Sequence, residues 1–130
     1  MTERLRPSDR IRRRPEFERA YEVGKRLHGR FMMLFVAPNG GSSSRLGVAA
    51  TRKLGSAVER NRAKRLAREI FRRHKLPVGL DVVIVPRREM LDAPFASLEA
   101  DYLATLARRD QEHAKAYPRG RRGPRPARRV

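Results

Sequence analysis

The alternation of apolar and polar positions first predicts three strands. Apolar and aromatic residues fill 31–37 and 46–51, and a compact β-branched run extends from Asp81 to Val85. Short apolar runs of this kind, bounded by glycine- and proline-rich breaks, are typical of strands. The segment 39–44 is rich in Asn, Gly and Ser, so we expect the first two strands to pair as a hairpin and the third to be buried.

A short amphipathic helix is predicted before the first strand. Pro15 suits the first turn of a helix, where its missing N–H costs little, and Gly24 is a suitable stop. The apolar face of this helix combines Phe17, Ala20 and Tyr21. We expect this face to lie toward the sheet.

Two longer helices follow. One begins at Ser56 or Ala57 and runs to about His74, and the other begins near Asp92, its expected N-cap. The element order is therefore αββαβα, which predicts an α+β sandwich of helices against a small central sheet. The apolar stripe of the last helix consists of Phe95, Leu98, Tyr102 and Leu106.

The composition divides the chain into an arm, one domain and a tail. At 130 residues the chain has the size of a single domain. We expect a basic arm at 1–9 and a folded domain at 10–110. Pro, Gly and Arg dominate the last residues, which predicts a disordered basic tail at 111–130.

The charge balance points to a polyanionic partner. The chain has 32 Lys and Arg against 14 Asp and Glu, a formal net charge of +18. A surplus of this size favours nucleic acid as the partner, with an anionic membrane surface as the second candidate. No apolar run approaches the roughly 20 residues that span a bilayer. The N-terminus lacks the apolar stretch of a secretory signal, and there is no cysteine, so we expect a cytoplasmic protein.

The solvent face of the longest helix gives the strongest functional signal. Its cations recur every fourth residue without an acid between them, although like charges at this spacing repel by a few tenths of a kcal/mol. A solvated face normally mixes signs, and phosphates would relieve the repulsion. The periodicity therefore favours an RNA- or DNA-binding helix over a merely solvated surface. The residues on this face are Arg60, Asn61, Lys64, Arg65, Arg68 and Arg72.

The residues from Gly47 to Leu66 carry a longer motif, GVAATRKLGSAVERNRAKRL. It consists of a strand that ends in a basic pair, a glycine turn, and a helix with the pattern Arg-Asn-Arg-x-Lys-Arg. This ordered stretch resembles the signature of the bacterial ribonuclease P protein subunit. The resemblance extends to 12–24, to 30–31 with 34–35, and to 81–87. It covers about residues 10–105 and does not include the C-terminal tail.

The resemblance implies an accessory subunit of an endoribonuclease. In that family a catalytic RNA removes the 5′ leader from precursor tRNA with magnesium, so the expected partners are this RNA and precursor tRNA. We expect no catalytic residue in the protein, no cofactor or metal bound by it alone, no membrane partner and no obligate protein partner. The resemblance also implies a left-handed crossover through the long helix, against the usual hand, with Gly55 in the turn before it.

The resemblance further implies two RNA-binding surfaces. A cleft between the first helix and the sheet would receive the unpaired leader, whose bases can stack on aromatic rings. The alternative is that these rings are core residues, for which Phe17 is the strongest case. The matching positions in the cleft are Arg13, Phe17, Tyr21, Phe35, Thr51 and Arg87. Those matching the catalytic-RNA surface are Arg52, Lys53, Arg60, Asn61, Arg62, Lys64, Arg65 and Arg68; Asn61 could instead cap local backbone.

Three other functions stay open on sequence grounds. A ribosomal protein or RNA chaperone would share the charge but has no need of the ordered motif. A cationic membrane-surface protein needs a larger apolar helix face. An independent nuclease needs clustered carboxylates or histidines, whereas His28, His74 and His113 lie in different predicted elements.

Overall fold

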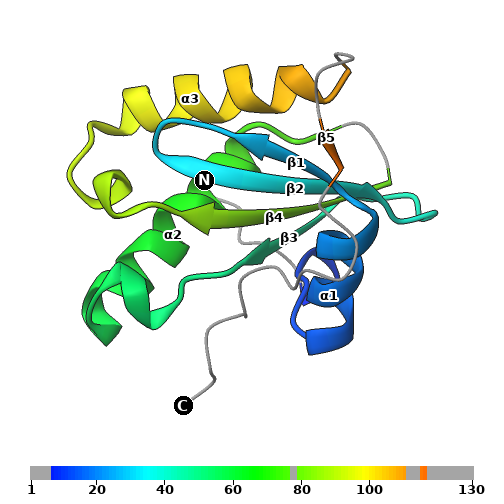
Figure 1. Ribbon diagram of the computed structural model, residues 1–130, viewed down its shortest axis with the longest axis horizontal. Helices are drawn as coiled ribbons and strands as arrows, with labels where there is room; N and C mark the ends of the chain where they lie inside the picture. The colour runs from blue at the N-terminus through cyan, green and yellow to red at the C-terminus, as the bar shows by residue number, and fades with distance from the viewer. Residues whose placement is uncertain (1–6, 77–78, 111–114, 117–130) are drawn as a thin grey trace.

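The computed structural model describes residues 7–76, 79–110 and 115–116. In this part of the chain a five-stranded sheet has α1 on one face and α2 and α3 on the other (Figure 1). The predicted α+β class with a central sheet is confirmed. The residues 117–130 of the predicted tail and residues 1–6 of the predicted arm lie outside the described residues.

The strand order is β3-β4-β2-β1-β5. β4 pairs in parallel with β3 and antiparallel with β2, so the predicted hairpin of β2 and β3 is wrong. The β-branched residues of β4 are buried on both faces, which suits a central position between the two strands. A parallel β3–β4 pair requires a crossover, which α2 supplies; its hand stays a prediction. The strands are β1 (Lys25–His28), β2 (Met32–Pro38), β3 (Arg45–Val48), β4 (Leu80–Pro86) and β5 (Lys115–Ala116).

The strand β1 was not predicted. Its sequence, KRLH, has a single buried side chain, Leu27, and lacks any β-branched residue. β1 forms because it pairs with β2, and a tight turn at Gly29 connects the two strands. A Cβ on Gly29 would lie 2.5 Å from the Thr105 hydroxyl, so close packing against α3 requires glycine here. The short β5 then pairs with β1, within the segment predicted to be disordered.

The helices are α1 (Arg14–Val23), α2 (Ala57–Arg73) and α3 (Phe95–Ala107). Pro15 in the first turn and Gly24 at the end of α1 are confirmed. Ser56 caps α2, since its hydroxyl accepts from the Glu59 N–H at 3.2 Å while the Glu59 carboxylate accepts from the Ser56 N–H at 2.9 Å.

The prediction that Asp92 caps α3 is wrong. Two buried residues, Met90 and Leu91, draw the chain into a short 3-10 helix, Arg88–Leu91, and Asp92 ends that helix. Pro94 then has an extended backbone before the first helical residue, Phe95. The predicted apolar stripe is confirmed, with Leu98, Tyr102 and Leu106 buried and Phe95 partly buried.

Each face of the sheet has its own core. β2 and β4 alternate, so Leu34 and Ile84 lie toward α2 and α3, whereas Phe35 and Val83 lie toward α1. The ten-residue α1 covers only part of its face. Met33 and Val85, one step further along the strands and paired with each other, stay partly exposed.

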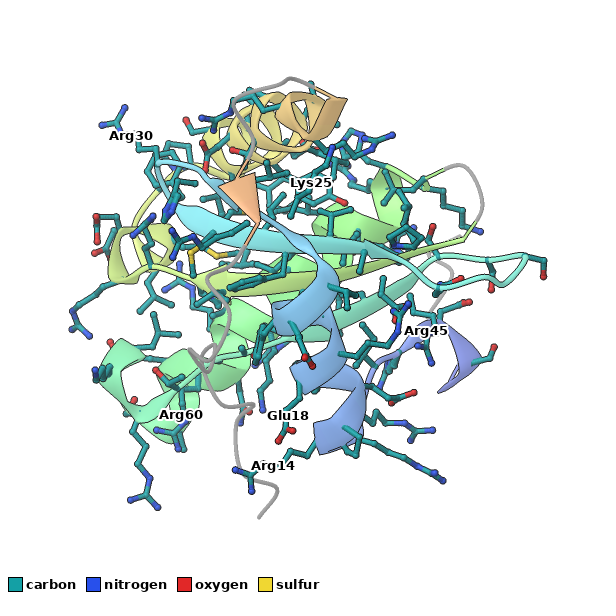
Figure 2. All side chains as sticks on the ribbon, turned by 45° about the vertical axis from the view of Figure 1, so that its right-hand side comes forward. Arg14, Glu18, Lys25, Arg30, Arg45 and Arg60 are labelled. Atoms are coloured by element: carbon teal, nitrogen blue, oxygen red, sulfur yellow. The ribbon has the colours of Figure 1, made fainter. Side chains whose placement is uncertain are left out.

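An ionic network fastens α1 to the sheet. The Arg45 guanidinium donates to both oxygens of Asp81, at 2.8 and 2.7 Å, and to Glu16 of α1 at 2.7 Å. Asp81 is 1% exposed and also accepts from the Asn39 side chain at 2.9 Å. Figure 2 shows Arg45 on the side of the sheet near α1. The ion pair and hydrogen bonds of Asp81 offset the free-energy cost of burying its charge.

Candidate nucleic-acid interface

The solvent side of α2 carries a set of cations without carboxylate partners, which we call the α2 face. Asn61, Arg62 and Arg65 are exposed, and the others are half-buried. Burial, then the neighbouring Arg68 and Arg60, lowers the pKa of Lys64. Within the described residues no cation of this set forms an ion pair. The α2 face consists of Arg60, Asn61, Arg62, Lys64, Arg65 and Arg68.

The α2 face is one turn shorter than predicted. Arg72 forms an ion pair with Glu69, whose carboxylate also lies 3.6 Å from the Arg73 guanidinium. The charges at this end of α2 are therefore balanced within the protein. Like-charge repulsion is concentrated between Arg60 and Arg68.

Arg10 adds a cation that the sequence analysis missed. A bridge between Arg10 and Leu46 continues the sheet at its β3 edge, and the Ile11 N–H donates to the Leu46 carbonyl at 2.8 Å. Burial, then the nearby Arg10 charge, lowers the pKa of Arg68. Arg10 comes close to α2 only in the folded chain, so no local sequence pattern could have predicted that it lies near Arg68.

A rigid basic turn joins β3 to α2. Arg52 and Lys53 are exposed in a 3-10 helix, Arg52–Leu54. Gly55 follows with a φ of 150°, a conformation that favours glycine, so its predicted place in the turn is confirmed. A Cβ there would also lie 2.3 Å from the Glu59 carboxylate that caps α2. The Arg88 guanidinium donates to the Leu54 carbonyl at 2.6 Å and holds the turn against the segment after β4.

A groove beside this turn has an apolar floor and a cationic rim. Its volume is about 320 Å³. Met33 and Val85 form part of the floor, while Lys53, Arg87 and Arg88 supply the cations. Apolar side chains with cations beside them suit one unpaired base and its phosphates. The lining residues are Met33, Thr51, Lys53, Leu54, Val85, Pro86, Arg87, Arg88 and Glu89.

The groove brings together some of the predicted leader-binding residues and not others. Thr51 and Arg87 line it, together with Lys53 from the other predicted set. Arg13 is exposed at the start of α1 and does not line the groove. The floor residues Met33 and Val85 were missed, although each lies two positions from a core residue on the same sheet face.

The three predicted aromatic residues lie beneath α1. Phe17, Tyr21 and Phe35 are 3%, 4% and 0% exposed, and none of them lines the groove. The Tyr21 ring meets the Phe35 ring edge-on, with centroids 4.8 Å apart. Of the two interpretations left open by the sequence, this arrangement favours core packing over stacking on bases.

The described ranges contain neither a candidate metal site nor a candidate membrane span. No group of three or more His, Cys, Asp and Glu side chains there could hold a metal ion. No helix in residues 7–76 or 79–110 is long and apolar enough to cross a membrane.

Comparison with known proteins gives one consistent family. The family model described as Ribonuclease P matches residues 5–110. The ribonuclease P protein component of Desulfovibrio desulfuricans is 44% identical over 105 residues, which cover 76% of this chain and 81% of that protein. The component from Thermotoga maritima is 40% identical over 92 residues, or 69% of this chain and 79% of that protein.

Solved structures agree with the sequence relatives. The Thermotoga maritima RNase P protein has a TM-score of 0.67 at 35% identity and covers 82% of this chain and 97% of its own. The Staphylococcus aureus RNase P protein has a TM-score of 0.69 at 28% identity, with 85% of this chain and 98% of its own covered. Both comparisons cover more than four fifths of this chain.

Proposed function

The chain belongs to the ribonuclease P protein family, and from that premise we propose that it assists a catalytic RNA in removing the 5′ leader of precursor tRNA. The observation that carries this proposal is the α2 face, a set of cations without carboxylate partners in the described residues. It continues through the basic turn at Arg52 and Lys53 into the groove. Two RNA segments can therefore bind side by side.

The catalytic RNA binds the α2 face. Phosphates there relieve the repulsion between Arg60, Lys64 and Arg68, and they release counterions from the RNA. The exposed guanidinium groups of Arg62 and Arg65 suit bidentate contacts with phosphate oxygens. Asn61, exposed among them, has both a donor and an acceptor for a base edge or a 2′-hydroxyl.

The leader lies in the groove. One unpaired base covers Met33 and Val85, and its phosphates contact Lys53, Arg87 and Arg88. Thr51 offers a hydroxyl at the same place. In this proposal the rings of α1 and β2, which are buried, act as core residues, and the leader base contacts Met33 and Val85 instead.

In this proposal the reacting groups and the magnesium ions belong to the RNA–protein complex. The protein neutralises phosphates, so fewer magnesium ions are needed to fold and hold the RNA. It also fixes the leader beside the cleavage site, which raises the effective concentration of the substrate. A cytoplasmic location would give the protein access to both RNAs.

The test is cleavage of precursor tRNA by a bacterial ribonuclease P RNA at low magnesium, with and without this protein. We expect cleavage at the mature 5′ end only with the protein. The α2 variant Arg62→Ala, made with Arg65→Ala, is expected to restore the need for high magnesium. Binding to RNA without any change in cleavage would contradict the proposal and leave a general basic RNA-binding protein.

A further inference from the structure

The turn between β1 and β2 holds two guanidinium groups on consecutive carbonyls. Arg87 donates from Nε to the Gly29 carbonyl at 3.1 Å, and Arg108 donates to the His28 carbonyl. Arg87 is thereby held at Nε, and Arg108 is held at Nη2, which also donates to the Thr105 hydroxyl at 3.2 Å. A guanidinium has five N–H donors, so both retain donors for a further partner. Arg87 directly follows β4 and Arg108 directly follows α3, and the turn brings them together.

The His28 side chain lies close to both of these cations. Burial, then the charges of Arg26, Arg87 and Arg108, lowers the pKa of His28, so its ring is neutral at pH 7. Its Nδ1 lies 3.2 Å from Arg87 Nη2, and a neutral ring can accept this hydrogen bond. The guanidinium groups of Arg26, Arg87 and Arg108 therefore lie near a neutral ring, and His28 adds no further positive charge to them.

Among the described residues, no carboxylate forms an ion pair with either of the two arginines. Asp101, the acid beside the turn, accepts from the backbone N–H groups of Arg30 and Phe31 at 2.9 and 2.8 Å. Arg30 lies at the tip of the turn, and Figure 2 shows its side chain extending into solvent, well apart from Arg60 of α2.

We propose that this turn binds a phosphodiester of RNA through Arg87 and Arg108, with Arg26 and Arg30 beside them; we call it the turn site. The inference rests on the proposed function, because Arg87 also lines the groove and thus joins the two places. A single strand that leaves the groove past Arg87 reaches Arg108 next. The turn site therefore binds leader nucleotides further from the cleavage point than the one in the groove.

The experiment compares the affinities of the complete RNA–protein complex for precursor tRNAs with short and long leaders. Leaders of about four and about sixteen nucleotides bracket the usual site size of such grooves. We expect Arg108→Gln to weaken binding of the long leader about threefold to fivefold and to reduce its salt slope by about 0.7. Binding of the short leader should not change. Arg30→Gln, at an exposed position, should act in the same direction.

The matched control is Arg19→Gln, which removes one positive charge from α1 at the opposite end of β2, where Arg19 donates to the Pro38 carbonyl. It should affect neither leader. Unchanged short-leader affinity also shows that Arg108→Gln folds. Equal effects of Arg108→Gln on both leaders, or none on either, would overturn the turn site. The groove would still stand as long as a short leader improves binding over mature tRNA.

Discussion

α1 and α2 pack on opposite faces of one sheet and use their side chains in opposite ways. α1 buries two aromatic rings, and its Glu16 carboxylate is bound by Arg45. α2 buries Ala63, Ala67, Ile70 and Phe71 against the sheet. Within the described residues, the cations of its α2 face have no acid partners. The first helix completes the fold, whereas the second exposes charge that only a polyanion would neutralise.

This difference shows that the chemistry of a side chain and its accessibility to a ligand are separate properties. Aromatic rings can stack on bases and arginines can bind phosphate, but a side chain acts only where the fold leaves it accessible. The Phe35 ring could stack on a base, but it is fully buried. Met33, two residues earlier on the same strand face, has no aromatic ring but lines the groove.

The largest expected effect tests whether the α1 side is core. Phe35→Ala should lower the free energy of unfolding by about 3–5 kcal/mol, because it removes a fully buried ring and leaves a cavity. Urea unfolding measures this loss. Phe35→Leu should cost less, about 1 kcal/mol, and keep the protein folded for leader-binding assays.

The control for that test is Val58→Ala on α2, where the side chain is 76% exposed. Its effect on unfolding should be within about 0.5 kcal/mol. If Phe35→Ala were equally mild but abolished the preference for leader-bearing tRNA, the ring would be a stacking platform, and the comparison between the two helices would fail.

The success of sequence analysis follows the same division. Periodicity within one element predicts which side chains of α2 lie on its solvent side, so Lys64 and Arg65 could be predicted from it, whereas Arg62 was predicted from the family resemblance. The partner of β3, the strand β1 and the nearness of Arg10 to Arg68 depend on contacts between distant segments. Local patterns carry no information on such contacts. The pairing of β3 and the burial of the aromatic rings could therefore not be predicted from the sequence.

The next effect concerns the α2 face. Arg62→Ala or Arg65→Ala should weaken binding to the catalytic RNA by about 1 kcal/mol, and each should reduce the slope of log affinity against log salt by about one. Filter binding over a range of salt concentrations gives both values. Arg73→Ala is the matched control, because carboxylates of Glu69 and Glu99 lie 3.6 and 3.2 Å from that side chain. Equal slopes for wild type and Arg62→Ala would remove Arg62 from the interface.

The smallest effect tests the ionic attachment of α1. Burial opposes ionisation of Glu16, but hydrogen bonds from the backbone N–H groups of Arg13 and Arg12 and from Arg45 hold its pKa below 4.5. A carboxyl group with a lowered pKa contributes stability that is present above its unfolded pKa and lost as the pH falls through its folded pKa. Glu16→Gln should therefore unfold more easily than wild type at pH 7, by less than about 1 kcal/mol, and the difference should shrink below pH 4.5.

Urea midpoints measured across this pH range give the comparison. Glu18→Gln, next to Glu16 on α1, is the matched control: its carboxylate pairs with Arg14 at 3.1 Å, but the side chain is 56% exposed. That variant should follow wild type at every pH, because an exposed pair contributes little. If Glu16→Gln did the same, Arg45 and Asp81 would suffice to hold the sheet edge. The attachment of α1 would then rest on its buried rings alone, and its contrast with α2 would be one of packing and not of charge.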